Sequence, residues 1–143
     1  MVRLSETFRE RLASYSPIFW CKAKDSFERQ VAWFNVLLGL DDTIALVDDE
    51  AGVVQGFAIG RLTPAPPVYA PGGPVCLIDD FCVADDAAWS TIGAGLLREI
   101  ETHAKQRGAV LSVVICAHLD AKKRELLARL QFAVTSEWHV RGL

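Results

Sequence analysis

The chain has 143 residues, 51% hydrophobic and 23% charged, a composition typical of one globular domain and not of a disordered segment. Its net charge of −3 argues against nucleic acid as the main partner. The four cysteines (Cys21, Cys76, Cys82 and Cys116) lack the spacing of a metal site, so we expect reduced thiols and no bound metal.

No segment predicts insertion into a membrane. The N-terminal residues lack the charged-then-apolar pattern of a signal peptide, and the uncharged run from Val31 to Leu40 is too short to cross a bilayer. We therefore expect a single cytoplasmic domain over residues 1–143, with no membrane partner.

The apolar periodicity predicts helices and strands in a mixed order. They are helix Ser5–Ser14, a helix from Asp25 or Ser26 to Gly39, strands Thr43–Val47, Val53–Leu62 and Val75–Val83, helix Ile92–Arg107, strand Val110–Ala117, helix Ala121–Leu130 and strand Phe132–Val140. We expect Ser5 to cap the first helix and residues 48–52 to form a hairpin turn. The proline-rich segment 63–74 is an irregular loop. The almost wholly apolar run Val110–Ala117 is typical of a strand covered on both faces.

A phosphate-binding turn is the leading functional interpretation of residues 77–100. An apolar strand, an acidic turn and a helix marked by Gly93 and Gly95 follow one another there, which aims helix N–H groups into a cleft. The alternative is that the glycines only allow close packing. The dinucleotide fingerprint fails because Arg98 stands where its third glycine would fall, and the Gly-Lys-Ser/Thr ending of a P-loop is absent.

The same region is acidic. No Lys or Arg lies between Arg61 and Arg98, and the carboxylates there are Asp79, Asp80, Asp85 and Asp86. An acidic cleft favours a cationic substrate. It also predicts that helix N–H groups, and not basic side chains, would hold a nearby phosphate.

The order of elements and the 77–100 stretch resemble the GNAT superfamily of acyl-CoA-dependent N-acetyltransferases. The family motif is Val-x-Pro-x-x-Arg/Gln-x-x-Gly-x-Gly/Ala before a Leu-Leu helix. With that pair at Leu96-Leu97, the motif places Val83 on the Val, Asp85 on the Pro, Ala88 on the Arg/Gln, and Thr91 and Gly93 on the glycines. Residues 120–132 look like the later family motif Asn-x-x-Ala-x-x-Leu-Tyr-x-x-x-Gly-Phe, with Leu126 and Phe132 retained. The likeness runs from roughly residue 25 to the C-terminus.

The resemblance implies an α/β (α+β) fold whose mixed, mostly antiparallel central sheet is flanked by helices, with the family's first strand missing. It also implies acetyl-CoA as the cofactor, its pantetheine chain paired with the bulged C-terminal half of the motif strand. The implied cofactor-binding residues are Phe81, Cys82, Val83, Ala88, Trp89, Ser90, Thr91, Ile92, Gly93 and Asp120.

The chain departs from the family pattern at several positions. They are Ala88 for the basic or amide side chain, Thr91 for a glycine, Lys123 for an alanine, Gln131 for a glycine and Leu127 for the tyrosine assigned to the leaving thiolate. Water or Cys116 could protonate the thiolate instead. These departures favour an alternative function, a non-catalytic acyl-CoA-binding or partner-binding module that kept the fold.

Acetyl transfer to an amine needs a proton acceptor, and a pair of aspartates precedes the motif residues. Strand alternation places Asp79 and Asp80 on opposite faces of the sheet. We expect Asp80 to accept the proton and Asp79 to contact the substrate. The alternative for either is a structural role, such as a pair with Arg61. Tyr69, in the proline-rich loop, either reaches the substrate or rests on the surface.

Other residues have structural interpretations beside their functional ones. Trp89 either packs on the helix or shields the pyrophosphate. Cys82 as a covalent acyl carrier is less favoured than a buried thiol. We expect His118 to be a solvent-facing loop histidine and not a general acid. We expect Asp120 to be a helix N-cap and not a catalytic residue. The run Lys122–Arg124 is typical of a solvated helix face, and the alternative is that one of its members meets a cofactor phosphate.

The sequence thus predicts an acetyl-CoA-dependent N-acetyltransferase whose acceptor is a primary amine of a small molecule or a protein. Catalysis would occur by direct attack of the amine on the thioester. Apolar residues of the final strand, around Trp138, could support a homodimer.

Overall fold

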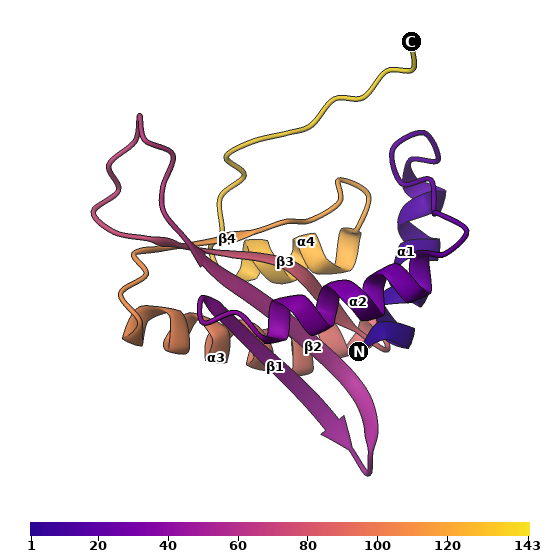
Figure 1. Cartoon of the computed structure of the whole chain (residues 1–143), viewed down its shortest axis with the longest axis horizontal. Helices are drawn as coiled ribbons and strands as arrows, with labels where there is room; N and C mark the ends of the chain where they lie inside the picture. The colour runs from indigo at the N-terminus through magenta and orange to yellow at the C-terminus, as the bar shows by residue number, and fades with distance from the viewer.

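A four-stranded sheet in the order β1-β2-β3-β4 lies between two layers of helices in the computed structural model, which describes residues 1–143 (Figure 1). Strands β1, β2 and β3 are antiparallel neighbours, whereas β3 and β4 are parallel. The elements are α1 (Val2–Tyr15), α2 (Ser26–Leu38), β1 (Thr43–Glu50), β2 (Val53–Thr63), β3 (Val75–Val83), the 3-10 helix η1 (Asp86–Ser90), α3 (Ile92–Gln106), β4 (Leu111–Val114) and α4 (Ala121–Arg129).

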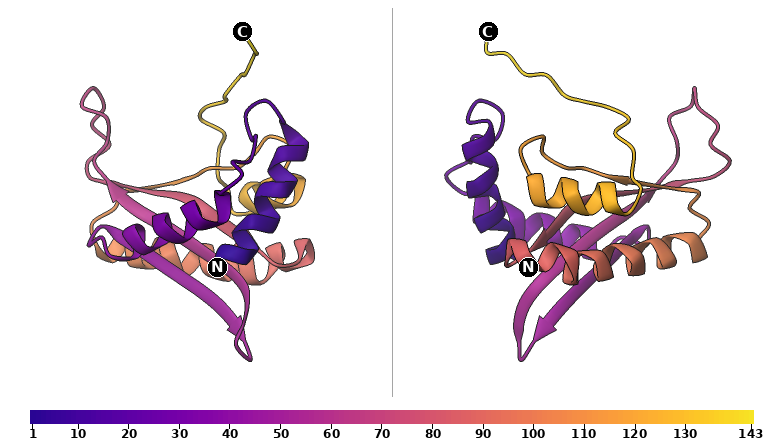
Figure 2. Two further views of the ribbon diagram at one scale, coloured as in Figure 1. Left: turned by 45° about the vertical axis from the view of Figure 1, so that its right-hand side comes forward. Right: turned by 180° about the vertical axis from the view of Figure 1, so that it is seen from behind.

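Each face of the sheet has its own hydrophobic core. Helices α3 and α4 cover one face, where Leu97 and Ile100 of α3 are fully buried against β2 and β3. Helices α1 and α2 cover the other face, where Phe34 of α2 packs edge-on against Phe57 of β2 (Figure 2). This layered mixed sheet, with α3 crossing over between two parallel strands, confirms the predicted fold class.

The hairpin between β1 and β2 turns over two residues with left-handed backbone. Ala51 has a φ of 52° and Gly52 a φ of 83°, and the N–H of Gly52 donates to Asp49 Oδ1 at 3.0 Å. Positive φ at both central residues is the geometry that matches the twist of paired strands. The predicted hairpin is therefore confirmed, but its turn is shorter than the expected 48–52, because residues 48–50 still pair with β2 as part of β1.

The prediction for the start of the first helix is wrong. Helix α1 begins at Val2, and Ser5 lies inside it, where its buried Oγ accepts a hydrogen bond from Arg9 Nη2 at 2.8 Å. The helix extends further towards the N-terminus because Val2 and Leu4 pack against the core beneath α2. Burial of these apolar side chains outweighs the local capping preference of a serine.

The prediction that the apolar run 110–117 is covered on both faces is also wrong. Strand β4 is short and lies at the edge of the sheet, and its side chains alternate between exposed and half-buried. The core under α1 and α2 includes no residue of β4, because those helices lie over the other three strands. Leu111 and Val113 are consequently exposed.

The expected final strand, Phe132–Val140, does not form. The last backbone hydrogen bond of the chain joins Phe132 N–H to the Leu127 carbonyl, and the residues beyond run away from the domain (Figure 1). A strand needs a neighbouring strand for its N–H and C=O groups, and no strand pairs with residues 132–140. The segment meets the rest of the chain through Trp138, whose ring lies edge-on to that of Phe19 with centres 5.8 Å apart. None of the helices combines the length and apolar character needed to cross a bilayer.

Candidate active site

Strand β3 carries a β-bulge at Asp79 and Asp80. Ala58 of β2 pairs with Phe81 and Gly60 pairs with Ile78, so the two aspartates together lie opposite Ile59. The extra residue resets the alternation of side chains, and Ile78 and Phe81 therefore enter the same core although they are three residues apart. The bulged strand expected from the resemblance is confirmed.

Asp80 is half-buried and faces the layer of α1 and α2. Its Oδ1 accepts a hydrogen bond from Gln30 Nε2 of α2 at 3.4 Å. Burial and the neighbouring charge of Asp79 raise the pKa of Asp80 to about 6, against the opposing charges of Arg9 and Lys123. A carboxyl with this pKa can exchange protons near neutral pH.

The structural alternative for the aspartates, a pair with Arg61, is not realised. Arg61 Nη2 instead lies 2.9 Å from Asp42 Oδ2. Asp79 stays exposed on the bulge. Asp80 is therefore the aspartate with a half-buried carboxyl and no salt bridge.

A cavity of about 250 Å³ lies next to Gln30, between α1 and the residues that lead into α2. It is lined by Arg9, Leu12, Phe19, Trp20, Cys21, Lys22, Ala23, Ser26, Arg29 and Gln30. Glu6 lies 2.8 Å from Arg9 and 2.7 Å from Lys22, and the hydrogen bond from Lys22 helps lower the pKa of Glu6 to about 2. Cations therefore line this cavity, although the nearby stretch of sequence is acidic.

Beyond Ile78, β3 continues without β4 beside it, and the side chain of Lys123 takes that place. The two strands pair only over residues 75–78 and 111–114, with one further hydrogen bond from Ile115 N–H to the Ile78 carbonyl. Lys123 of α4 is only 1% exposed, and its Nζ donates to the carbonyl of Phe81 at 3.2 Å. The Nζ also lies 5.1 to 5.7 Å from the centres of three rings, those of Phe8, Phe81 and Trp89.

The prediction that Lys123 lies on a solvated helix face is wrong. Burial lowers the pKa of Lys123, while the nearby Cys116 and Asp120 act in the opposite direction. The sequence did hold a signal, because Lys123 precedes the buried Leu126 and Leu127 by three and four residues and so shares their helix face.

Asp120 caps α4, as one of its two interpretations predicted. Its Oδ1 accepts a hydrogen bond from the N–H of Lys123 at 3.4 Å, while its Oδ2 is buried without a partner. The Nε1 of Trp89 is likewise buried and unpaired. Buried polar atoms are costly unless water, an ion or a ligand pairs with them.

Two arginines flank the turn between β3 and α3. Arg11 of α1 forms an ion pair with Asp86, and Arg129 Nη2 of α4 donates to the carbonyl of Ser90 at 3.1 Å. Asp85 caps the 3-10 helix η1, because its Oδ1 accepts a hydrogen bond from the N–H of Ala87 at 2.9 Å. The sequence predicted that helix N–H groups, and not basic side chains, would hold a phosphate here; the fold nevertheless brings arginines to this turn from two distant helices.

Helix α3 begins directly after η1, so its N-terminal end lies at this turn. The first N–H groups of a helix have no carbonyl partner within the helix itself. The helix dipole adds partial positive charge at this end. The turn and the two arginines therefore form a place suited to phosphate.

Gly93 serves close packing, the alternative left open for the glycines. A Cβ on Gly93 would lie 2.7 Å from the ring of Trp89. Trp89 is itself buried, edge-on to Phe81 with ring centres 4.9 Å apart. The indole thus packs between helix and sheet, which is the first of its two predicted positions.

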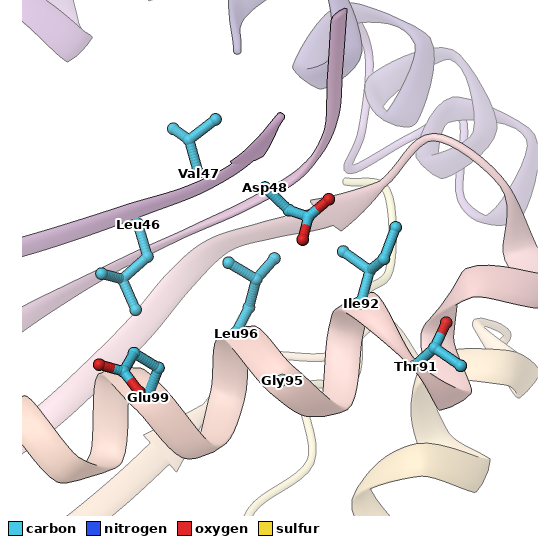
Figure 3. Close-up of a pocket in the computed structure, with 8 residues that line it drawn as sticks. All are labelled: Leu46, Val47, Asp48, Thr91, Ile92, Gly95, Leu96 and Glu99. Carbon is cyan, nitrogen blue, oxygen red and sulfur yellow. The ribbon is translucent and has the colours of Figure 1, made fainter. Parts of the chain in front are cut away.

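Gly95 faces a separate, shallow groove of about 380 Å³ between β1 and α3 (Figure 3). Ile92 and Leu96 project from α3 towards the strands there, and Thr91 lies at the start of the helix. The only charged residues of the groove are Asp48 and Glu99. It has no cation and no residue bonded to Asp80, whereas the cavity beside α1 includes Gln30, which donates to Asp80. We therefore assign the groove no role in the site.

The structure brings Asp80, Phe81, Trp89 and Asp120 together around Lys123, but other predicted residues lie elsewhere or are inert. Tyr69 is 70% exposed in the loop before β3, at the opposite end of that strand from Phe81. His118 is an exposed loop residue. Burial raises the pKa of Cys82 to about 12, which leaves its thiol protonated and disfavours a covalent acyl carrier.

Sequence reasoning missed Tyr15 at the end of α1. Burial raises the pKa of its hydroxyl, and the negative charge of Asp120 adds to this shift. Tyr15 is far from the motifs along the chain, so no local pattern could indicate it. It is the phenol that the fold places near Asp120 in the absence of a tyrosine at position 127.

Comparisons with known proteins support the fold and the family. The sequence profile of the Acetyltransferase (GNAT) family matches residues 6–132. A predicted acetyltransferase of Clostridium acetobutylicum, crystallised with acetyl-CoA, is 19% identical with a TM-score of 0.70, over 95% of this chain and 86% of that one. A mutant of a Bacillus halodurans protein is 16% identical with a TM-score of 0.81, over 99% and 90% of the two chains.

An aminoglycoside N-acetyltransferase in complex with CoA is 15% identical with a TM-score of 0.67, over 81% of this chain and 87% of that one. At these identities the structural likeness shows the fold alone. A comparison with curated protein sequences finds no significant match. The profile match spans most of the chain, and the protein therefore belongs to the GNAT acetyltransferase family.

Proposed function

We propose that the protein is an acetyl-CoA-dependent N-acetyltransferase in which Asp80 accepts the proton of a primary amine. The observation that carries this proposal is the half-buried carboxyl of Asp80, with its pKa raised to about 6, on the bulge of β3 beside the cavity at Gln30. An alkyl ammonium with a pKa near 10.4 must lose a proton before it can attack, which costs about 4–5 kcal/mol at pH 7. A carboxylate that receives this proton, directly or through water, lowers that barrier.

The residues present fit an acyl-CoA donor. The positive N-terminal end of α3, with Arg11 and Arg129 beside it, suits its phosphates. The backbone of residues 81–83, which β4 does not pair, suits the amide groups of its pantetheine chain. The buried and unpaired Oδ2 of Asp120 provides one further acceptor. Bound there, the donor supplies the activated acetyl group.

Tyr15 is the residue we propose to replace the missing tyrosine at position 127. Its phenol carries a proton at neutral pH that it can donate to a leaving thiolate, although its raised pKa makes it a weaker acid than a free phenol. Protonation is helpful but not essential, because a thiolate with a pKa near 8.5 is a tolerable leaving group.

The acceptor is a primary amine whose other groups contact a cavity of mixed character. Phe19 and Trp20 offer apolar surface, whereas Arg9, Lys22 and Arg29 are each ion-paired with a carboxylate. Their charges are thus largely balanced, and the cavity itself adds no strong preference for the charge of the acceptor. The amine itself would approach Asp80, the carboxyl next to this cavity.

A second candidate function, a non-catalytic acyl-CoA-binding or partner-binding module, is favoured by one observation. The Nζ of Lys123 already donates a hydrogen bond to the carbonyl of Phe81. An acyl-CoA whose pantetheine chain pairs with this part of β3 must displace the Nζ. A protein that has lost donor binding would tolerate this contact.

Two measurements separate the candidates. Calorimetric titration with acetyl-CoA tests donor binding, and release of free CoA with a panel of primary amines tests transfer. We expect binding and amine-dependent release in the parent, with release abolished in Asp80→Asn and retained in Asp79→Asn. Binding without release in the parent would support the module, and unchanged release in Asp80→Asn would exclude Asp80 as the base.

A further inference from the structure

Lys123 is the buried nucleophile that the proposed transfer to an external amine does not use. Its ammonium form would carry three N–H donors, but the structure gives its Nζ a single acceptor, the carbonyl of Phe81. The faces of three aromatic rings surround the rest of the Nζ and attract a cation, but complete burial opposes the charge and lowers the pKa of Lys123. With one acceptor for its N–H groups, the hydrogen bonding of the Nζ satisfies a neutral amine better than a cation.

The charges around Lys123 do not reverse this preference. Asp120, Cys116, Cys82 and Asp79 all favour the cation, yet the effect of burial outweighs them and lowers the pKa of Lys123. Burial also keeps both thiols protonated and therefore uncharged. The neutral amine, with its free electron pair, is the reactive form of a lysine.

The position of the amine adds a second, geometric argument. Nζ lies 3.2 Å from the carbonyl of Phe81, on the stretch of β3 that we assign to the donor's pantetheine chain. The neighbouring Lys122 differs in every respect, since it is exposed and its Nζ lies 3.1 Å from Glu125. Lys123 is thus the lysine that a bound thioester would meet inside the domain.

We propose that Lys123 is an internal acetyl acceptor, so that the protein modifies its own buried lysine when acetyl-CoA is bound. This inference rests on the donor site of the proposed function. The electron pair of Nζ attacks the thioester carbonyl, a C–N bond forms and the C–S bond breaks. The nitrogen gives its surplus proton to the departing thiolate, which leaves as the thiol of CoA.

The product is stable where it forms. An acetylated lysine cannot carry a charge, so the modification removes the cost of an ammonium group buried without a full set of partners. An amide does not transfer its acetyl group further under ordinary conditions. The reaction therefore stops after one acetyl group per chain, and the modified side chain stays in the place of the donor.

The test is a time course with acetyl-CoA at neutral pH, followed by peptide mass spectrometry of all five lysines, Lys22, Lys24, Lys105, Lys122 and Lys123. Acetylation without catalysis follows exposure, so Lys123 should react last of all. We expect it to react first, at least tenfold faster than Lys122, and to lose this lead when the chain is unfolded in urea. Lys122→Arg should leave the reaction intact, and Lys123→Met should abolish it.

Calorimetric titration of the same samples with acetyl-CoA separates the possible failures. Binding of acetyl-CoA without acetylation of Lys123 would overturn this inference and leave the proposed function standing. Absence of binding would overturn both. Equal rates at Lys122 and Lys123 in the folded protein would show chemical acetylation alone and would also overturn the inference.

Discussion

The Nζ of Lys123 donates a hydrogen bond to the main-chain carbonyl of Phe81, 3.2 Å away, and so links α4 to the half of β3 that β4 leaves unpaired. Both residues are almost completely buried. A main-chain acceptor normally bonds to a neighbouring strand or to water, and here a lysine fills that need. This contact couples the charge of one side chain to the stability of the fold.

Removal of the Lys123 amine should change how stability depends on pH. Because burial lowers the pKa of Lys123 in the folded state, the unfolded chain binds more protons at pH values just below 10, and stability rises with pH in that range. The free energy of unfolding of the parent, minus that of Lys123→Met, should therefore rise from neutral pH towards pH 10, by up to about 1.4 kcal/mol per pH unit. Urea unfolding at a series of pH values measures this difference.

Lys122→Met is the matched control for this prediction. Lys122 is exposed on the same helix and paired with Glu125, so its removal should leave the pH dependence of the parent unchanged. A flat difference for Lys123→Met as well would contradict the lowered pKa of the buried amine.

The pKa of Asp80 should appear in the pH profile of acetyl transfer. We expect kcat/KM to fall on the acid side with a midpoint at about 6, because the protonated carboxyl cannot accept a proton from the amine. Asp79→Asn should shift the midpoint to lower pH, since the charge of Asp79 helps to raise the pKa of Asp80. Asp80→Asn should lose about 10²–10⁴-fold in kcat. A midpoint near 4 in the parent would contradict this role.

The same residue predicts a stability effect of definite sign. The folded protein binds the Asp80 proton up to a pH of about 6, whereas the unfolded chain releases it near 3.8, so ionisation of Asp80 destabilises the fold as the pH rises through this window. Asp80→Asn should consequently be more stable than the parent at pH 8, and this advantage should vanish below pH 4. Thermal unfolding of the two proteins at both pH values checks the sign, and a constant difference would contradict it.

The two glycines of α3 should respond in opposite ways to alanine. A Cβ at position 93 would lie 2.7 Å from the Trp89 ring, and we expect Gly93→Ala to cost about 1–3 kcal/mol of stability. Gly95 has nothing within 4 Å of an added Cβ, so Gly95→Ala should stabilise the helix by about 0.5–1 kcal/mol. Urea unfolding of both variants decides whether Gly93 is present for packing. A cost smaller than about 0.5 kcal/mol at Gly93 would exclude that explanation.

The elements with strong periodicity could be predicted from the sequence, and β3 was predicted residue for residue. The aspartates on that strand were identifiable because two carboxylates inside an apolar run must have a special environment. The bulge and the partner of Asp80 were not, because the register with β2 and the position of Gln30 depend on tertiary packing. The same reason explains why Arg11 and Tyr15 were missed, both from a helix remote in sequence from the motifs.

The segment 132–140 shows the limit of pattern reasoning more directly. Apolar residues at 132, 134, 138 and 140 alternate as in a strand, but a strand also needs an available edge, and no pattern within the segment can show whether this chain supplies one. Residues 132–140 have the apolar alternation of a strand, but they form no strand in the structure.

Self-association is the last prediction, and it follows from that unpaired segment. Trp138 is 76% exposed, and the outer edge of β4 presents Leu111 and Val113 without a neighbouring strand. Unpaired edges and exposed apolar side chains favour contact with another chain. We predict that the protein forms a homodimer at micromolar concentration and that Trp138→Ser weakens the dimer at least tenfold. Val68→Ser, at an equally exposed residue in the β2–β3 loop, should have no effect. Sedimentation equilibrium measures both, and a parent that stays monomeric at high concentration would contradict the dimer.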